Sequence, residues 1–205
     1  MIEGDISPGR DRKRIIMAHP PNCDGDLLFQ DWIAHAVAHG KGVKLDFKNP
    51  DVVSCCLEYL AQNSVPVPVV VNADVIVGPG GPEPTINANK FIRECKALPV
   101  QPLLSIGWTT GAKEGSRYSD RSIGLALELA RTYGGSVTFP IRTCFLRDSW
   151  ASIQVLIESR EYTLTLWNGV EDVPGLDLLQ WIEKTLSPTS FFYDLIKSDL
   201  SPLRL

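Results

Sequence analysis

Residues 43–48 read Val-Lys-Leu-Asp-Phe-Lys, a pattern typical of a β-strand with one polar and one apolar face. Side chains along a strand point alternately to its two faces, so the three polar residues share one face and the apolar residues share the other. The same spacing of polar residues recurs in Glu3-Gly4-Asp5 and in Asn72-Ala73-Asp74, the latter directly after the apolar run Val69-Val70-Val71. Strands that turn polar at their carboxyl ends predict a parallel sheet or barrel with a polar site where the strands end.

Helix-like and strand-like segments alternate along the chain, as is typical of α/β proteins. If Ile15–His19 is the return arm of a hairpin, seven parallel strands remain, centred near residues 4, 45, 70, 105, 139, 165 and 192. The spacing predicts a TIM-type (β/α)8 barrel with the first of its eight strands missing. An open doubly wound sheet is the alternative, but no glycine-rich dinucleotide-binding turn follows the first strand.

Composition indicates one domain over residues 1–205, N-terminally incomplete as a barrel. The net charge of −4 argues against a nucleic-acid partner, because no basic surplus is available to neutralise phosphates. The sequence contains neither a basic-then-apolar signal peptide nor an apolar run of about 20 residues. These features predict a cytoplasmic protein, or a secreted one if a segment precedes Met1. The five scattered cysteines, which include no CxxC, are expected to be buried free thiols.

Three carboxylates are expected to meet at the mouth of neighbouring strands: Glu3, Asp5 and Asp46. Such groups do not stay ionised side by side without compensation, and Mg²⁺ or Ca²⁺ is a natural partner for oxygen ligands. A salt-bridge network at the rim explains the same residues equally well. Lys48 adds a positive charge suited to a phosphate, and His19 ends its own strand, where a general acid or base can operate.

Further polar and aromatic residues at strand ends are candidates for substrate binding. Arg142 is equally well explained as a phosphate contact or as a partner of a rim carboxylate. Trp108 and Trp167 either line a pocket or pack under loops. The complete set comprises Lys44, Asn72, Asp74, Trp108, Arg142 and Trp167.

Segments spread over most of the chain, in order, resemble the menorin family. The most distinctive is Gly107-Trp108-Thr109-Thr110-Gly111; the others are Glu3-Gly4-Asp5, Ala18-His19-Pro20-Pro21, Lys44–Lys48, Asn72-Ala73-Asp74, Phe139–Arg142 and Leu164–Trp167. That family is similar to phospholipase C-like phosphodiesterases, which include glycerophosphodiester phosphodiesterases and sphingomyelinase D. The resemblance implies a Mg²⁺ site at Glu3, Asp5 and Asp46. It also implies catalytic roles for His19 and Lys48, and a phosphodiester or lysophospholipid-like ligand.

One departure from the family pattern affects the expected activity. The related enzymes carry a first histidine in a Trp-x-His-Ala strand before Glu-x-Asp, and no such strand precedes Glu3 here. The resemblance therefore implies a Mg²⁺-dependent phosphodiesterase-like protein that is weak or inactive as written. The alternative is a non-catalytic barrel of the menorin type that binds a protein partner in cell recognition or neuronal development.

Overall fold

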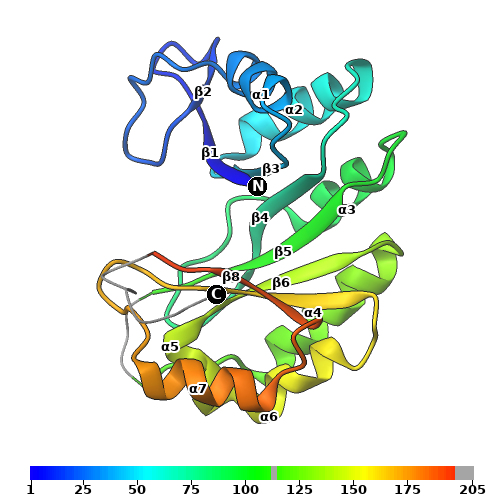
Figure 1. Ribbon diagram of the computed structural model, residues 1–205. Coiled ribbons are helices and arrows are strands. Elements are labelled where there is room, and N and C mark those ends of the chain that lie inside the picture. The colour runs from blue at the N-terminus through cyan, green and yellow to red at the C-terminus, as the bar shows by residue number, and fades with distance from the viewer. Residues whose placement is uncertain (112–114, 197–205) are drawn as a thin grey trace.

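The computed structural model describes residues 1–111 and 115–196 and consists of one curled sheet with helices around it (Figure 1). The strands are β1 Ile2–Pro8, β2 Ile15–Met17, β3 Val43–Phe47, β4 Val69–Val77, β5 Leu103–Thr109, β6 Val137–Arg142, β7 Tyr162–Trp167 and β8 Phe191–Asp194. The helices are α1 Phe29–Ala38, α2 Pro50–Gln62, α3 Ala88–Lys96, α4 Asp120–Tyr133, α5 Thr143–Leu146, α6 Trp150–Ile153 and α7 Leu176–Thr185. Two 3₁₀ turns, η1 Arg147–Ser149 and η2 Gln154–Ile157, flank α6.

The sheet is open. Its strand order is β2-β1-β3-β4-β5-β6-β7-β8, with β2 antiparallel to β1 and every other pairing parallel. The expected α/β class, the hairpin and the parallel strands are thereby confirmed. Within the described residues β8 does not pair with β1, so the sheet is a half-barrel and the closed (β/α)8 barrel is not observed.

Helix boundaries follow local capping chemistry. Asn49, Asn87 and Ser119 each accept a hydrogen bond from a backbone N–H in the first turn of α2, α3 and α4, which satisfies a donor that the helix itself cannot. Gly134 closes α4 in the left-handed conformation, at φ 73°. In contrast, α1 begins at Phe29 without a side-chain cap.

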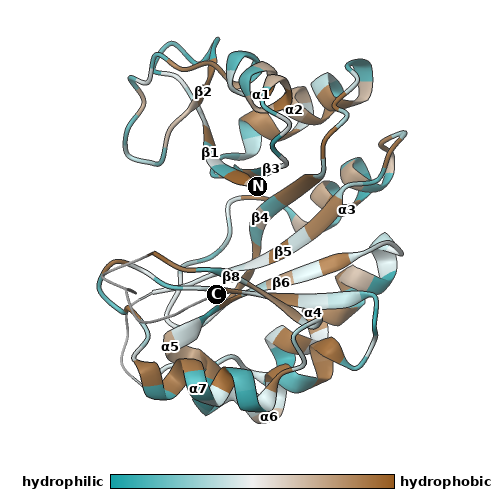
Figure 2. Cartoon of the chain, viewed as in Figure 1, coloured by the Kyte–Doolittle hydropathy of each residue, from teal (hydrophilic) through white to brown (hydrophobic). Residues whose placement is uncertain are grey.

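The two faces of the sheet differ in polarity. On the outer face, Leu45 and Phe47 are buried, and Phe47 packs edge-on against Phe91 of α3 with ring centroids 6.3 Å apart. Figure 2 shows strands that are largely hydrophobic beside helices of mixed character, as expected when each helix turns an apolar face to the sheet. On the inner face, one line of paired residues crosses five strands and is polar throughout: Asp5, Asp46, Asn72, Ser105 and Thr138.

The Gly107–Gly111 segment is distinctive because it packs against a second glycine-rich loop. The N–H of Gly78 donates to the carbonyl of Thr109 at 3.0 Å, and the N–H of Gly111 donates to the carbonyl of Pro79 at 2.9 Å. A Cβ at Gly81 would lie 2.1 Å from the Thr109 carbonyl oxygen. The backbones therefore approach more closely than any side chain allows, and the Gly78–Gly81 loop is fixed by β5.

Two expectations about exposure have different outcomes. No helix in residues 1–111 and 115–196 is both long and apolar enough to cross a bilayer. All five cysteines are free, as expected, but the prediction that they are buried is wrong in part: Cys56 and Cys95 are buried, whereas Cys55 and Cys144 are exposed.

Two glycine substitutions, with opposite expected effects on stability, test the packing of the Gly78–Gly81 loop against β5. Gly81→Ala should destabilise the fold by about 1–3 kcal/mol, the usual cost of overpacking, because its Cβ meets Thr109 backbone. Gly124→Ala is the matched control, since a Cβ within α4 meets open space and should stabilise by about 0.5–1 kcal/mol. Chemical denaturation measures both, and equal effects would contradict the loop packing.

Candidate functional site

A cavity of about 670 Å³ opens at the carboxyl ends of the strands. It collects most of the predicted site residues, although they are far apart in the sequence. Its ionisable lining consists of Glu3, Asp5, His19, Lys44, Asp46, Lys48, Asp74, Glu171 and Asp194. Asn72 and Trp167 also line it, as expected for substrate-binding residues.

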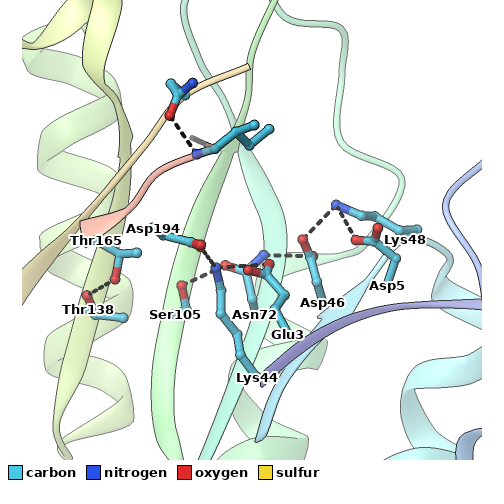
Figure 3. Close-up of polar contacts among 12 residues, drawn as sticks. Glu3, Asp5, Lys44, Asp46, Lys48, Asn72, Ser105, Thr138, Thr165 and Asp194 are labelled. Carbon is cyan, nitrogen blue, oxygen red and sulfur yellow. Dashed lines mark hydrogen bonds and ion pairs between the residues drawn. The ribbon is translucent and has the colours of Figure 1, made fainter. Parts of the chain in front are cut away.

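Asp46 is the most buried of these carboxylates and is held by a chain of hydrogen bonds (Figure 3). The Ser105 hydroxyl donates to Oδ1 of Asn72 at 2.6 Å, and Nδ2 of Asn72 donates to Oδ1 of Asp46 at 2.8 Å. Both supporting residues are buried, with Ser105 at 0% exposure. The hydrogen bonds from Ser105 to Asn72 and from Asn72 to Asp46 thus fix the orientation of the Asp46 carboxylate. Only one orientation of the Asn72 amide satisfies both neighbours.

Lys44 of β3 and Lys48, directly after β3, neutralise carboxylates from three strands (Figure 3). Nζ of Lys48 lies 2.6 Å from Asp46 and 3.2 Å from Asp5. Nζ of Lys44 lies 2.6 Å from Asp194 and 3.0 Å from Glu3. Burial alone would lower the pKa of each lysine, but the adjacent carboxylates outweigh it and raise both. Both lysines therefore stay charged.

Negative charge still exceeds positive charge at this site. Burial raises the pKa of Glu3 to about 7, against the opposing effect of Lys44. Burial, followed by the charge of Asp46, raises the pKa of Asp74 to about 7. For Asp194 burial acts in the same direction, but Lys44 and the hydrogen bond to Glu3 outweigh it and lower the pKa. Glu3 and Asp74 therefore take up a proton more readily than exposed carboxyl groups do.

His19 reaches the cavity from the segment after β2. The N–H of Ala18 donates to the carbonyl of Asp5 at 2.9 Å, which ties this segment to the end of β1. Nδ1 of His19 lies 2.6 Å from the carbonyl oxygen of Pro20. Because a carbonyl only accepts, Nδ1 carries the proton and Nε2 of the neutral ring is left to accept one.

The predicted metal ligands are only partly brought together. As the side chains stand, no group of three or more His, Cys, Asp or Glu residues within 1–111 and 115–196 is arranged to hold a metal. Asp5 and Asp46 nonetheless converge on one cation, the Lys48 ammonium, whereas Glu3 is turned toward Lys44. Mg²⁺ usually takes one or two carboxylates and keeps several waters, so this donor pair fits it.

Two of the predicted substrate-binding residues do not line the cavity. Trp108 is 2% exposed and packs edge-on against Tyr118 in the core. The guanidinium of Arg142 binds Asp172 at 2.8 Å and Glu171 at 2.5 Å, and lies 5.3 Å from the Trp167 ring centroid. Arg142 thus holds the loop after β7, which forms one wall of the cavity.

Sequence reasoning missed Asp194 and Ser105. Asp194 ends β8, and only the curl of the sheet brings it to Lys44, which is 150 residues away. The available signal was its position at a strand end, like Asp46. Ser105 lies opposite Asn72 in the register of β4 and β5, and this pairing gives it a structural role that its own strand does not reveal.

Replacing Arg142 tests whether it anchors this loop. Arg142→Met should destabilise the protein by about 1.5–3 kcal/mol, because the charge-assisted hydrogen bonds from the buried guanidinium to Asp172 are lost. Arg147→Met is the matched control: it also stacks on a tryptophan and pairs with an aspartate, but on the surface, and should cost under about 1 kcal/mol. Denaturant midpoints compare the two, and equal costs would contradict the anchoring role.

Comparison with known proteins agrees with the resemblance noted in the sequence. The family described as Menorin N-terminal domain matches residues 1–200. "Protein FAM151B" from Homo sapiens is 32% identical over 206 residues, which cover 96% of this chain and 75% of that protein. No solved structure matches the chain significantly. On the family match and this identity, the chain belongs to the menorin family.

Proposed function

We propose that this chain is a Mg²⁺-dependent phosphodiesterase acting on glycerophosphodiester or lysophospholipid-like substrates. The observation that carries the proposal is the charge balance of the cavity, in which four paired carboxylates from three strands share only two lysines. A hard divalent cation would supply the missing positive charge and would attract the phosphate of a substrate. Ca²⁺ is the second cation that oxygen ligands of this kind can hold.

The proposal includes a relationship in fold. We infer that the curled sheet is most of a TIM-type barrel of the phospholipase C-like phosphodiesterase kind. The polar residues at the carboxyl ends of parallel strands support this relationship, because barrel enzymes build their sites there.

Each residue would have a distinct role. Asp5 and Asp46 would hold the cation, and Lys48 would turn its ammonium toward a phosphoryl oxygen. The bound cation would stabilise negative charge on the phosphoryl group. His19 would accept a proton at Nε2, the nitrogen that its hydrogen bond to Pro20 leaves free. Asn72 and Ser105 would keep Asp46 in place.

Cation binding can be measured without any substrate. Calorimetric titration of Mg²⁺, with Ca²⁺ in parallel, should show one site in the wild-type protein and none in Asp46→Asn. Asp24→Asn is the control, because Asp24 is an exposed carboxylate paired with Arg10 away from the cavity. Equal binding by all three proteins would place the cation elsewhere.

Lys48→Met should change the affinities for cation and phosphate in opposite directions. Mg²⁺ should bind more tightly, since the ammonium no longer competes for Asp5 and Asp46. Glycerophosphodiester affinity should fall about ten- to hundred-fold, the equivalent of losing one charged hydrogen bond. Calorimetry gives both values, and a fall in both affinities would indicate general damage to the site.

A further inference from the structure

Asp74 has a local structure that no other carboxylate in the cavity shares. It lies on the inner face of β4, two residues beyond Asn72, and the pairing of β4 with β5 shifts directly after it. A β-bulge of this kind re-aims a side chain and is common next to active sites. The bulge places the carboxyl group in the mouth of the cavity.

Gly107 makes the space that this carboxyl group occupies. It is the direct partner of Asp74 on β5, and a Cβ there would lie 2.3 Å from Oδ1 of Asp74. Any other residue at this position would displace the aspartate. The glycine of the Gly-Trp-Thr-Thr-Gly segment is thus matched to an acidic side chain on the neighbouring strand.

Within residues 1–111 and 115–196, the carboxyl group of Asp74 also has no hydrogen-bond or ion-pair partner. Glu3, Asp5, Asp46 and Asp194 each lie within ion-pair distance of a lysine. Among the described residues no hydrogen bond or ion pair reaches the side chain of Asp74, although it is half-buried. A half-buried carboxyl group without a partner favours its protonated form, which can donate to a ligand.

We propose that Asp74 is a catalytic residue, the general acid that protonates the leaving alcohol during phosphodiester hydrolysis. The inference rests on the proposed function and extends it. It supplies a second proton-transfer group beside His19 in the same cavity.

His19 and Asp74 together carry out the two proton transfers that phosphodiester hydrolysis needs. A water oxygen forms a bond to phosphorus, and the proton that it loses goes to Nε2 of His19. The bond from phosphorus to the alkoxy oxygen breaks with its electron pair on that oxygen, which takes the proton of Asp74. The products are a phosphomonoester and an alcohol. Exchange with solvent returns the proton from His19 and restores the acid form of Asp74.

The surroundings of Asp74 predict how the step depends on pH. Lys44 and Asp46 of β3 face it, as does Lys48 directly after β3. Tyr118 faces it from the segment before α4, and His19 lines the same cavity. Burial and Asp46 together raise the pKa of Asp74 to about 7. Burial is the larger of the two effects and does not depend on the charge of Asp46, so acid-catalysed hydrolysis should decline as the pH rises and the acid form of Asp74 is lost.

Two substrates separate acid catalysis from binding. Glycerophosphoethanolamine has an alkoxide leaving group that needs a proton, whereas methyl 4-nitrophenyl phosphate releases a nitrophenolate that does not. With Mg²⁺ present, Asp74→Asn should lower kcat for the first about 10²- to 10⁴-fold and remove the decline of activity with rising pH. For the second, kcat should change less than about threefold. Asp74→Glu should recover part of the lost rate.

Each other outcome has a defined meaning. Equal losses on both substrates in a variant with an unchanged melting temperature would overturn the assignment, because they indicate a binding or structural role. Unchanged activity in Asp74→Asn would overturn it too, while the proposed function would stand. A wild-type protein inactive on both substrates would overturn the proposed function itself. Gly107→Ala supplies a second variant, which should reproduce the substrate-selective loss by displacing Asp74.

Discussion

A carboxylate held away from water must find both hydrogen-bond donors and positive charge, and the inner face of this sheet is organised around that requirement at Asp46. Asn72 and Ser105 supply the donors through a directed chain, and Lys48 supplies the charge. These residues fill a row that in a closed parallel barrel is usually apolar. Removal of any one of them would leave another buried polar group without its partner, so the row gives the site its rigidity.

The same requirement links the site to the open edge of the sheet. Lys44 binds Glu3 of β1 and Asp194 of β8, two strands that do not pair with each other within the described residues. These three residues also line a second cavity of about 400 Å³, whose other walls are mainly apolar and include Ile2, Val70 and Phe192. The ion pairs of Lys44 therefore connect β1 with β8 through side chains. They also lie between the polar cavity and the second, mainly apolar cavity.

The sequence was sufficient to predict local structure, but not to predict which side chains from distant strands contact one another. Polar residues two apart at strand ends predicted the inner face correctly, because alternation in a strand is a property of the backbone. The same reasoning placed His19, Asp46 and Lys48 at one cavity. It did not find Asp194, since that contact depends on how far the sheet curls. It treated Trp108 and Trp167 alike, although Trp108 is buried in the core and Trp167 lines the cavity. A position at the end of a strand does not by itself show whether a side chain is covered by a loop.

Diffraction from crystals soaked in Mn²⁺, with data collected near the manganese absorption edge, tests the central claim most directly. We expect one anomalous peak between the carboxylates of Asp5 and Asp46, with the Lys48 ammonium displaced from the position it holds between them. A peak elsewhere, or a Lys48 side chain that remains between the two carboxylates at saturating Mn²⁺, would contradict the account.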